Sequence, residues 1–192
     1  MILIVNNHSR DLPELKECLS ELGADFFLRD QRSMLNNLEK KDVTGIILSG
    51  GSPFIDHKIY LSRIRADIAS LLNYDVPVLG ICEGHEIIAE VFGGEVVKMK
   101  KPSEYNDLEV TIKERRAIFS GLPRTVKVYE HHSRYVKGVE RNFITAATSK
   151  KNEIEAIFHR ERPIFGVQFH PEMSGETGKK ILKNFIDICL SG

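Results

Sequence analysis

Short apolar runs alternate with segments of helical periodicity along the first half of the chain. Residues 1–5, 44–48 and 76–81 are apolar almost throughout, which is the pattern of strands buried on both faces of a parallel sheet. Residues 11–23 place leucines at helical spacing between Asp11, the expected N-cap, and a terminating glycine. This alternation predicts a right-handed, doubly wound α/β sheet. The other elements expected in this half are a strand at 24–28 and helices at 59–72 and 83–92.

The second half of the chain changes character, because short strand-like runs follow one another with little helix between them. Helical periodicity returns at 177–189, where the apolar residues share one face. No repeat, low-complexity segment or Pro/Ser-rich linker divides the sequence, so we expect a single domain over residues 1–192. The strands expected in this half are 108–112, 125–129, 143–147, 153–158 and 163–169.

The composition excludes several classes of protein. The 192 residues carry 27 Lys and Arg against 27 Asp and Glu, and a zero net charge lacks the basic signature of a nucleic-acid-binding protein. The longest apolar runs fall far short of the ~20 residues of a membrane span, and residues 1–10 lack the pattern of a signal peptide. The three cysteines form no CxxC motif and cannot all pair. We therefore expect a cytoplasmic protein with free thiols and no nucleic-acid or membrane partner.

The strongest chemical signal is the segment 80–84, Gly-Ile-Cys-Glu-Gly, which lies between an expected strand and an expected helix. A nucleophile on such a sharp turn needs a glycine on each side, because there is no room for side chains there. The amino end of the following helix directs unpaired N–H groups at Cys82, which favours its thiolate. Cys82 is therefore the candidate nucleophile, and the alternative is a buried cysteine in an ordinary turn.

A thiolate nucleophile needs a base and a group that orients the base. His170 and Glu172 stand two residues apart in the segment 166–172, Gly-Val-Gln-Phe-His-Pro-Glu, so in an extended chain their side chains share one face. Glu172 could then hold the imidazole in the tautomer that accepts a proton. The turn 48–53, Leu-Ser-Gly-Gly-Ser-Pro, follows an expected strand, and its glycines allow a backbone N–H to approach a developing oxyanion.

These three motifs stand in the order found in the class I, or triad, glutamine amidotransferases, and the chain resembles that family over nearly its whole length. Within the family, residues 119–129 and 166–189 are most similar to the glutaminase subunit of GMP synthetase. The resemblance implies a three-layer, flavodoxin-like, mostly parallel sheet with a small additional antiparallel element. It implies that Cys82 is the nucleophile, His170 the base and Glu172 its orienting partner. The backbone N–H groups of Gly51 and Glu83 would form the oxyanion hole.

The implied reaction is hydrolysis of glutamine to glutamate through a γ-glutamyl thioester. The ammonia would pass to a separate ATP-pyrophosphatase-type synthetase that makes GMP from XMP, and that partner, rather than this chain, would bind ATP and Mg²⁺. The implied substrate contacts are Gly50, Glu86, and the backbone of Ser133 and Arg134 in a loop. The neighbouring histidines 131–132 lack a third ligand at a sensible spacing, so we expect no metal site.

The chain departs from the family pattern beside the nucleophile. Glu86 replaces the usual glutamine that contacts the substrate, and a carboxylate can accept a hydrogen bond but not donate one. Glu83 places an acid next to the thiol, which raises the thiol pKa unless the side chain turns away. Residues 6–10, Asn-Asn-His-Ser-Arg, replace Asp-Asn-Gly-Gly-Gln. These departures leave open a stand-alone γ-glutamyl hydrolase, the glutaminase of another amidotransferase, and a degenerate regulatory subunit without catalysis.

Overall fold

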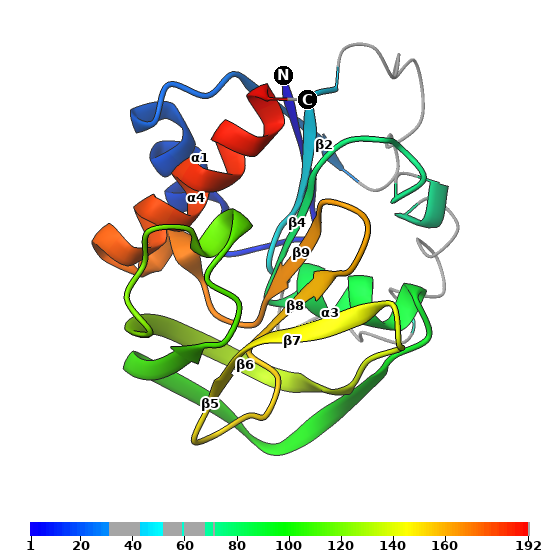
Figure 1. Ribbon diagram of the computed structural model, residues 1–192, viewed down its shortest axis with the longest axis vertical. Coiled ribbons are helices and arrows are strands. Elements are labelled where there is room, and N and C mark those ends of the chain that lie inside the picture. Colours follow the sequence, from blue (N-terminus) through cyan, green and yellow to red (C-terminus); the bar gives the residue numbers. More distant parts are fainter. Residues whose placement is uncertain (31–42, 52–58, 60–67, 71, 192) are drawn as a thin grey trace.

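The computed structural model describes residues 1–30, 43–51, 59, 68–70 and 72–191 (Figure 1). Nine strands in these residues form one sheet, in the order β2-β1-β3-β4-β9-β8-β7-β5-β6. The first five strands in that order pair in parallel, which is the 2-1-3-4-5 order of flavodoxin-like sheets, and the later pairs are antiparallel. The strands are β1 (Ile2–Asn6), β2 (Phe26–Asp30), β3 (Gly45–Leu48), β4 (Val78–Ile81), β5 (Glu95–Ile112), β6 (Thr125–Gly138), β7 (Phe143–Ser149), β8 (Ala156–His159) and β9 (Ile164–Val167).

Helices cover both faces of the parallel half of the sheet, as Figure 1 shows. Helices α1 (Leu12–Glu21) and α4 (Gly175–Leu190) lie side by side on one face, and α3 (Glu83–Val91) packs on the other. Side chains alternate along each strand and so build two cores. In β1, Ile2 and Ile4 join the core that contains α1 and α4, whereas Leu3 and Val5 join the core that contains α3. The predicted three-layer α/β class with its doubly wound sheet is confirmed.

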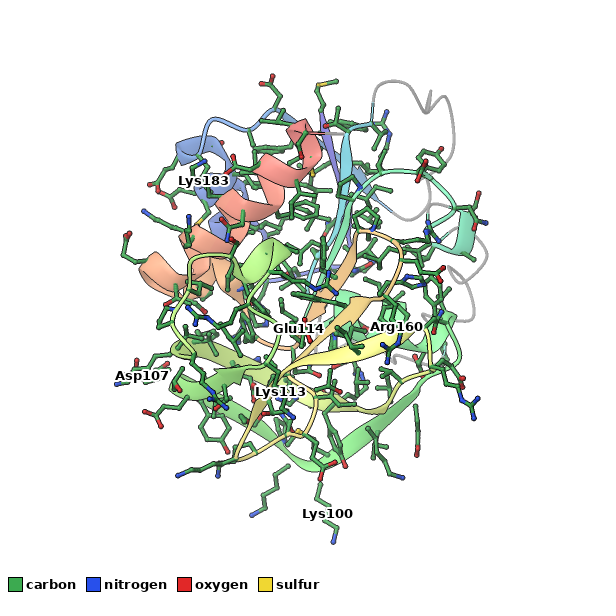
Figure 2. The ribbon with its side chains drawn as sticks, viewed as in Figure 1. Lys100, Asp107, Lys113, Glu114, Arg160 and Lys183 are labelled. Carbon is green, nitrogen blue, oxygen red and sulfur yellow. The ribbon has the colours of Figure 1, made fainter. Side chains whose placement is uncertain are left out.

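The antiparallel half is larger than the sequence indicated. β5 begins at Glu95 and β6 continues to Gly138, whereas the apolar pattern predicted only 108–112 and 125–129 there. Residues 95–107 bury few side chains and therefore lack the alternation that marks a half-buried strand. They pair with β6 through the backbone, with register shifts along the way. Charged side chains such as Lys100 and Asp107 project outward from β5 (Figure 2).

The remaining elements lie close to their predicted positions. The helix predicted at 59–72 falls largely outside the described residues, of which 59, 68–70 and 72 are helical. Across the part of the chain that the structure describes, every helix is too short or too polar to cross a membrane. Two short 3-10 helices complete the described secondary structure: η3 (Ala117–Phe119) and η4 (Pro171–Met173).

The segments with candidate chemistry follow β1, β3, β4 and β9, whose carboxyl ends meet at one edge of the sheet. Hydrogen bonds join the first two of these segments. Asn7 Nδ2 donates to Ser49 O at 2.7 Å, and the N–H of Asn7 donates to Ser49 Oγ at 2.9 Å. The fold therefore gathers motifs that are far apart in sequence at the place where open α/β sheets build their sites.

Candidate active site

Cys82 occupies the turn between β4 and α3, as predicted. Its backbone has φ 49° and ψ −103°, in the positive-φ region that L-residues rarely adopt. Its N–H donates to Val167 O at 2.8 Å, which holds the turn against β9. A Cβ added to Gly80 would lie 2.5 Å from Gly84 O, and one added to Gly84 would lie 2.2 Å from Leu48 O. This close packing of backbone explains the glycine on each side of the cysteine.

Replacing Gly84 with alanine is expected to lower the free energy of unfolding by about 1–3 kcal/mol or more, because the new Cβ would overlap backbone that cannot move aside. Gly138→Ala in β6 is the matched control, since a Cβ at that position meets nothing within 4 Å. Denaturant unfolding of both variants measures the difference. Equal stability of the two variants would contradict the packing described for the turn.

His170 follows β9, and its ring and the Cys82 thiol are near enough to shift each other's pKa, so the structure brings the predicted nucleophile and base together. The Cys82 thiol itself donates to His131 O at 3.7 Å. Nδ1 of His170 lies 2.9 Å from Glu172 Oε1, and both side chains are almost fully buried. Glu172 reaches the ring from the 3-10 turn η4 rather than from an extended strand. The backbone N–H of His170 donates to Tyr129 O at 2.9 Å, which fixes the segment to β6. With Nδ1 donating to Glu172, Nε2 is the nitrogen that can accept the thiol proton.

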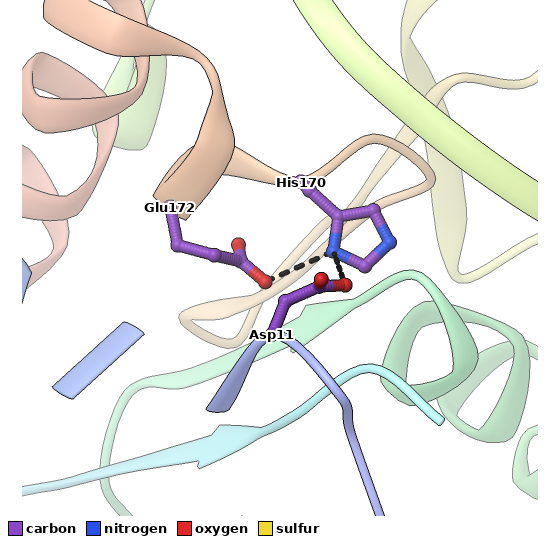
Figure 3. A group of neighbouring side chains, drawn as sticks. All are labelled: Asp11, His170 and Glu172. Atoms are coloured by element: carbon purple, nitrogen blue, oxygen red, sulfur yellow. Dashed lines mark hydrogen bonds and ion pairs between the residues drawn. The ribbon is translucent and has the colours of Figure 1, made fainter. Parts of the chain in front are cut away.

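Asp11 supplies a second carboxylate beside His170, which the sequence did not reveal. Asp11 holds the predicted N-cap position of α1, but its side chain makes no capping hydrogen bond. Instead, Asp11 Oδ2 lies 3.5 Å from His170 Nδ1, and its Oδ1 accepts a hydrogen bond from Arg10 Nε at 3.3 Å. Figure 3 shows the carboxylates of Asp11 and Glu172 both turned toward this ring nitrogen. An acid shortly after the first strand was the available signal, but only the fold places it next to the histidine.

Asp11, His170 and Glu172 are also residue types that bind metal ions, and one ligand atom from each lies within 4.8 Å of the others. Nδ1 of the histidine, however, is already engaged by Glu172 at hydrogen-bond distance. We therefore interpret the two carboxylates as groups that orient the imidazole and stabilise its positive charge.

Burial is the largest single influence on the pKa of both Cys82 and His170, but it decides the direction of the shift only for Cys82. Burial raises the pKa of the Cys82 thiol, and the nearby charge of His170 offsets this increase only in part. Burial alone would lower the pKa of His170, but the charges of Glu172 and Cys82 outweigh it and raise that pKa well above its ordinary value. The prediction that the helix amino end favours the thiolate is therefore incomplete. The thiolate depends on the imidazolium beside it.

The glycines after β3 stand against the reacting groups, where the sequence predicted them. A Cβ added to Gly50 would lie 3.1 Å from His170 Cε1. One added to Gly51 would lie 1.3 Å from Glu83 Oε2. The backbone of this turn can therefore approach a ligand in the site only because both residues lack a side chain. The rest of the motif, residues 52–53, lies outside the described residues.

A cavity of about 190 Å³ opens beside Cys82. Three of the predicted substrate contacts, Glu86, Ser133 and Arg134, line it, whereas Gly50 lies beside His170 rather than in the cavity wall. The expectation that residues 133–134 belong to a loop is wrong, because β6 extends through them. The cavity is lined by Arg10, Gly51, Cys82, Glu83, Glu86, Pro102, His131, His132, Ser133 and Arg134.

Arg134 pairs with both of the acids that depart from the family pattern. Its Nε donates to Glu86 Oε2 at 2.8 Å, and its Nη2 lies 3.1 Å from Glu83 Oε1. The other oxygen of Glu86 accepts a hydrogen bond from Gln168 Nε2 at 3.1 Å. Glu83 is buried and has not turned away to the helix surface. The sequence identified the two acids and the arginine separately, and the direct contact of Glu86 with substrate stays a prediction.

Three further residues, His85, Cys18 and Cys189, serve as packing residues. His85 is fully buried in α3, and burial lowers its pKa to about 3, so the ring is neutral. Burial raises the pKa of Cys189, on the apolar face of α4, to about 12. Cys18 is half-buried in α1, and burial raises its pKa too. Of the three free thiols, that of Cys82 alone lines the cavity.

Residues 3–189 match the family glutamine amidotransferase class-I. A glutamine-hydrolysing GMP synthase subunit from Pyrococcus abyssi is 39% identical over 193 residues, which cover 98% of this chain and 98% of that protein. The corresponding protein of Pyrococcus furiosus is 38% identical with the same coverage of both chains. The crystal structure of a candidate GMP synthase subunit from Thermoplasma acidophilum superposes with a TM-score of 0.85 at 32% identity, covering 99% of this chain and 94% of that one. Because these matches extend over nearly the whole sequence and its three motifs, the chain belongs to the class-I glutamine amidotransferase family.

Proposed function

We propose that this chain is the glutaminase subunit of an amidotransferase and hydrolyses glutamine to glutamate and ammonia. The observation that carries the proposal is the arrangement at the edge of the sheet. Cys82 lies on a strained turn and lines a cavity, with His170 beside it and Glu172 on the Nδ1 nitrogen of the imidazole. A buried thiol, a base and an orienting carboxylate are the groups that acyl transfer through a thioester requires.

In the proposed reaction, His170 Nε2 takes the proton of Cys82 as the sulfur attacks the side-chain carbonyl carbon of glutamine. The carbonyl oxygen becomes an oxyanion, which backbone N–H groups of Gly51 and Glu83 stabilise. His170 gives the proton to the leaving nitrogen, so that ammonia departs and a γ-glutamyl thioester remains. Water then attacks the thioester with His170 as base, and glutamate and the thiol are released. Glu172 orients the imidazole throughout.

We further propose that the ammonia passes to a separate synthetase subunit of the ATP-pyrophosphatase type, which makes GMP from XMP. The support is that relatives named as subunits of glutamine-hydrolysing GMP synthase match this chain over 98% of their own length. ATP and Mg²⁺ belong to the partner in this proposal, because thioester chemistry needs neither. The three unpaired thiols support a reducing, cytoplasmic location.

Glutamine hydrolysis by the chain alone is expected to be slow, and to rise when the synthetase subunit, XMP, ATP and Mg²⁺ are added. The physical reason is that burial raises the pKa of the Cys82 thiol, which disfavours the reactive thiolate. The assay follows glutamate and GMP with glutamine as the nitrogen source. A parallel reaction that contains ammonium salt and only the synthetase subunit shows that the partner is active.

Two outcomes would contradict this proposal. If GMP forms from ammonium but never from glutamine when both subunits are present, the chain is not the ammonia source. If the chain alone hydrolyses a γ-glutamyl peptide faster than glutamine, and adding the synthetase does not change its rate, the stand-alone hydrolase is the correct function. Glu86 in the cavity wall is the observation that keeps this second function open.

A further inference from the structure

We propose that Arg134 is the counter-charge that keeps Cys82 usable as a nucleophile in a site that carries two acidic side chains. The inference rests on the proposed function, because it assigns a positioning role in the same thiol chemistry. It concerns the features that set this chain apart from its family pattern, Glu83 and Glu86. Its test reads the thiol directly and needs no glutamine turnover.

The two acids lie on the first turn of the helix that begins at the nucleophile. Glu83 follows Cys82 directly in the chain, and the N–H of Glu86 donates to Cys82 O at 3.1 Å. Their side chains are only 3% and 1% exposed, so water screens neither carboxylate well. Two buried negative charges in this position oppose a third one on the sulfur.

Glu83 also lies against the proposed oxyanion hole. A Cβ on Gly51 would sit 1.3 Å from Glu83 Oε2, so this carboxylate packs directly on the glycine whose N–H would receive the oxyanion. A carboxylate there opposes the negative charge that develops on the carbonyl oxygen during the reaction. The same side chain therefore disfavours both the thiolate and the intermediate unless a cation balances it.

Arg134 is the cation that the structure places on both acids. It reaches them from β6, across the cavity wall, at 2.8 Å to Glu86 and 3.1 Å to Glu83. Burial alone would lower the pKa of Arg134, but the charges of Glu86, Glu83 and Cys82 raise it above its ordinary value. The guanidinium thus stays charged, and a thiolate on Cys82 is among the groups that stabilise it.

The other titratable groups that face the site are engaged elsewhere. Behind β9, His170 is balanced by Glu172 at 2.9 Å. After β1, Arg10 is balanced by Asp11 at 3.3 Å. In β6, His132 Nε2 lies 2.6 Å from Oε1 of the buried Glu130. Burial lowers the pKa of His131, which favours its neutral form. Among the described residues, Arg134 is therefore the group positioned to neutralise the acids of α3.

The test measures how fast iodoacetamide alkylates Cys82 as a function of pH, with peptide mass spectrometry to separate Cys82 from Cys18 and Cys189. Arg134→Gln is expected to raise the apparent pKa of Cys82 by about one unit or more, and to slow its alkylation at neutral pH by about tenfold or more. Glu83→Leu, with Arg134 present, is expected to shift the apparent pKa in the opposite direction. Lys183→Gln, which breaks an exposed pair with Asp187, is the control for net charge and is expected to leave the profile unchanged.

A triple variant separates electrostatics from structural damage. The triple variant Glu83→Leu/Glu86→Gln/Arg134→Gln removes both carboxylates together with the guanidinium. The apparent pKa of Cys82 in this variant is expected to equal that of the parent or to lie below it. An unshifted profile in Arg134→Gln, or a triple variant as slow as Arg134→Gln, would overturn the proposal. Thermal unfolding shows whether Arg134→Gln folds. If it does not, Glu83→Leu provides the test, and an apparent pKa of Cys82 that does not fall in this variant would overturn the proposal. The alkylation test does not depend on glutamine hydrolysis. Failure of the proposal about Arg134 can therefore be distinguished from failure of the proposed function.

Discussion

Cys82→Ala is expected to reduce glutamine hydrolysis by about four powers of ten or more, measured in the presence of the synthetase subunit. The reason is that no other described thiol can replace it. Cys18 and Cys189 belong to α1 and α4, and neither lines the cavity. Cys189→Ala is the matched control and is expected to keep the parent rate, at some cost in stability. It removes a buried sulfur that packs on Gly45 at the amino end of β3, away from the carboxyl ends that carry the site.

Covalent labelling gives an independent measure of the same residue. Diazo-oxonorleucine, an electrophile shaped like glutamine, is expected to modify Cys82 and spare the two packing cysteines. Peptide mass spectrometry identifies the modified residue. Label on Cys18 or Cys189, or an unlabelled Cys82 with the synthetase subunit present, would contradict the enzyme assignment of this site.

His170→Ala is expected to lower glutamine turnover by about two to four powers of ten, which is the usual contribution of a general base. Glu172→Gln is expected to cost less, because the imidazole remains and Asp11 Oδ2 still lies 3.5 Å from Nδ1. The double variant Asp11→Asn/Glu172→Gln is then expected to lose more than the two single variants predict together. Steady-state kcat/KM for glutamine, compared across the parent, His170→Ala, Asp11→Asn, Glu172→Gln and the double variant, measures these losses.

The pH profile adds a signature that loss of structure would not produce. The charge of Glu172 raises the pKa of His170, so removing that charge lowers this pKa. Activity requires the cysteine and histidine to share a single proton, and it declines when acid protonates both. In Glu172→Gln the acidic limb of the profile is therefore expected to move to lower pH. Parent-like activity of His170→Ala, or an unmoved limb in Glu172→Gln, would refute the assigned roles.

The sequence was informative wherever the deciding residues are neighbours. The turn around Cys82 illustrates this in part. Glycine is required at 80 by the backbone of the turn itself at Gly84, whereas it is required at 84 by Leu48 of the neighbouring strand β3. The pairing of His170 with Glu172 is also local, although a 3-10 turn rather than an extended strand brings the two together. The buried strands of the parallel half were readable because their neighbours on both faces are apolar. By contrast, the outer part of β5 carries no apolar pattern, since backbone pairing rather than burial holds it.

The sequence alone therefore determined the α/β class and the family to which the chain belongs, and it identified Cys82 and His170 as the candidate nucleophile and base. Only the tertiary structure decided the electrostatics around them. The sequence predicted Asp11 to be a helix cap, but in the structure its carboxylate lies beside His170. Arg134 forms its hydrogen bond with Glu86, which is 48 residues away in the chain. Periodicity and motif spacing encode what a short stretch of backbone does. Which distant charges end up beside the histidine or the acids of α3 depends on strand order. The parallel strands bring their carboxyl ends together whatever lies between them in the chain, and the antiparallel strand β6 carries Arg134 to the same site.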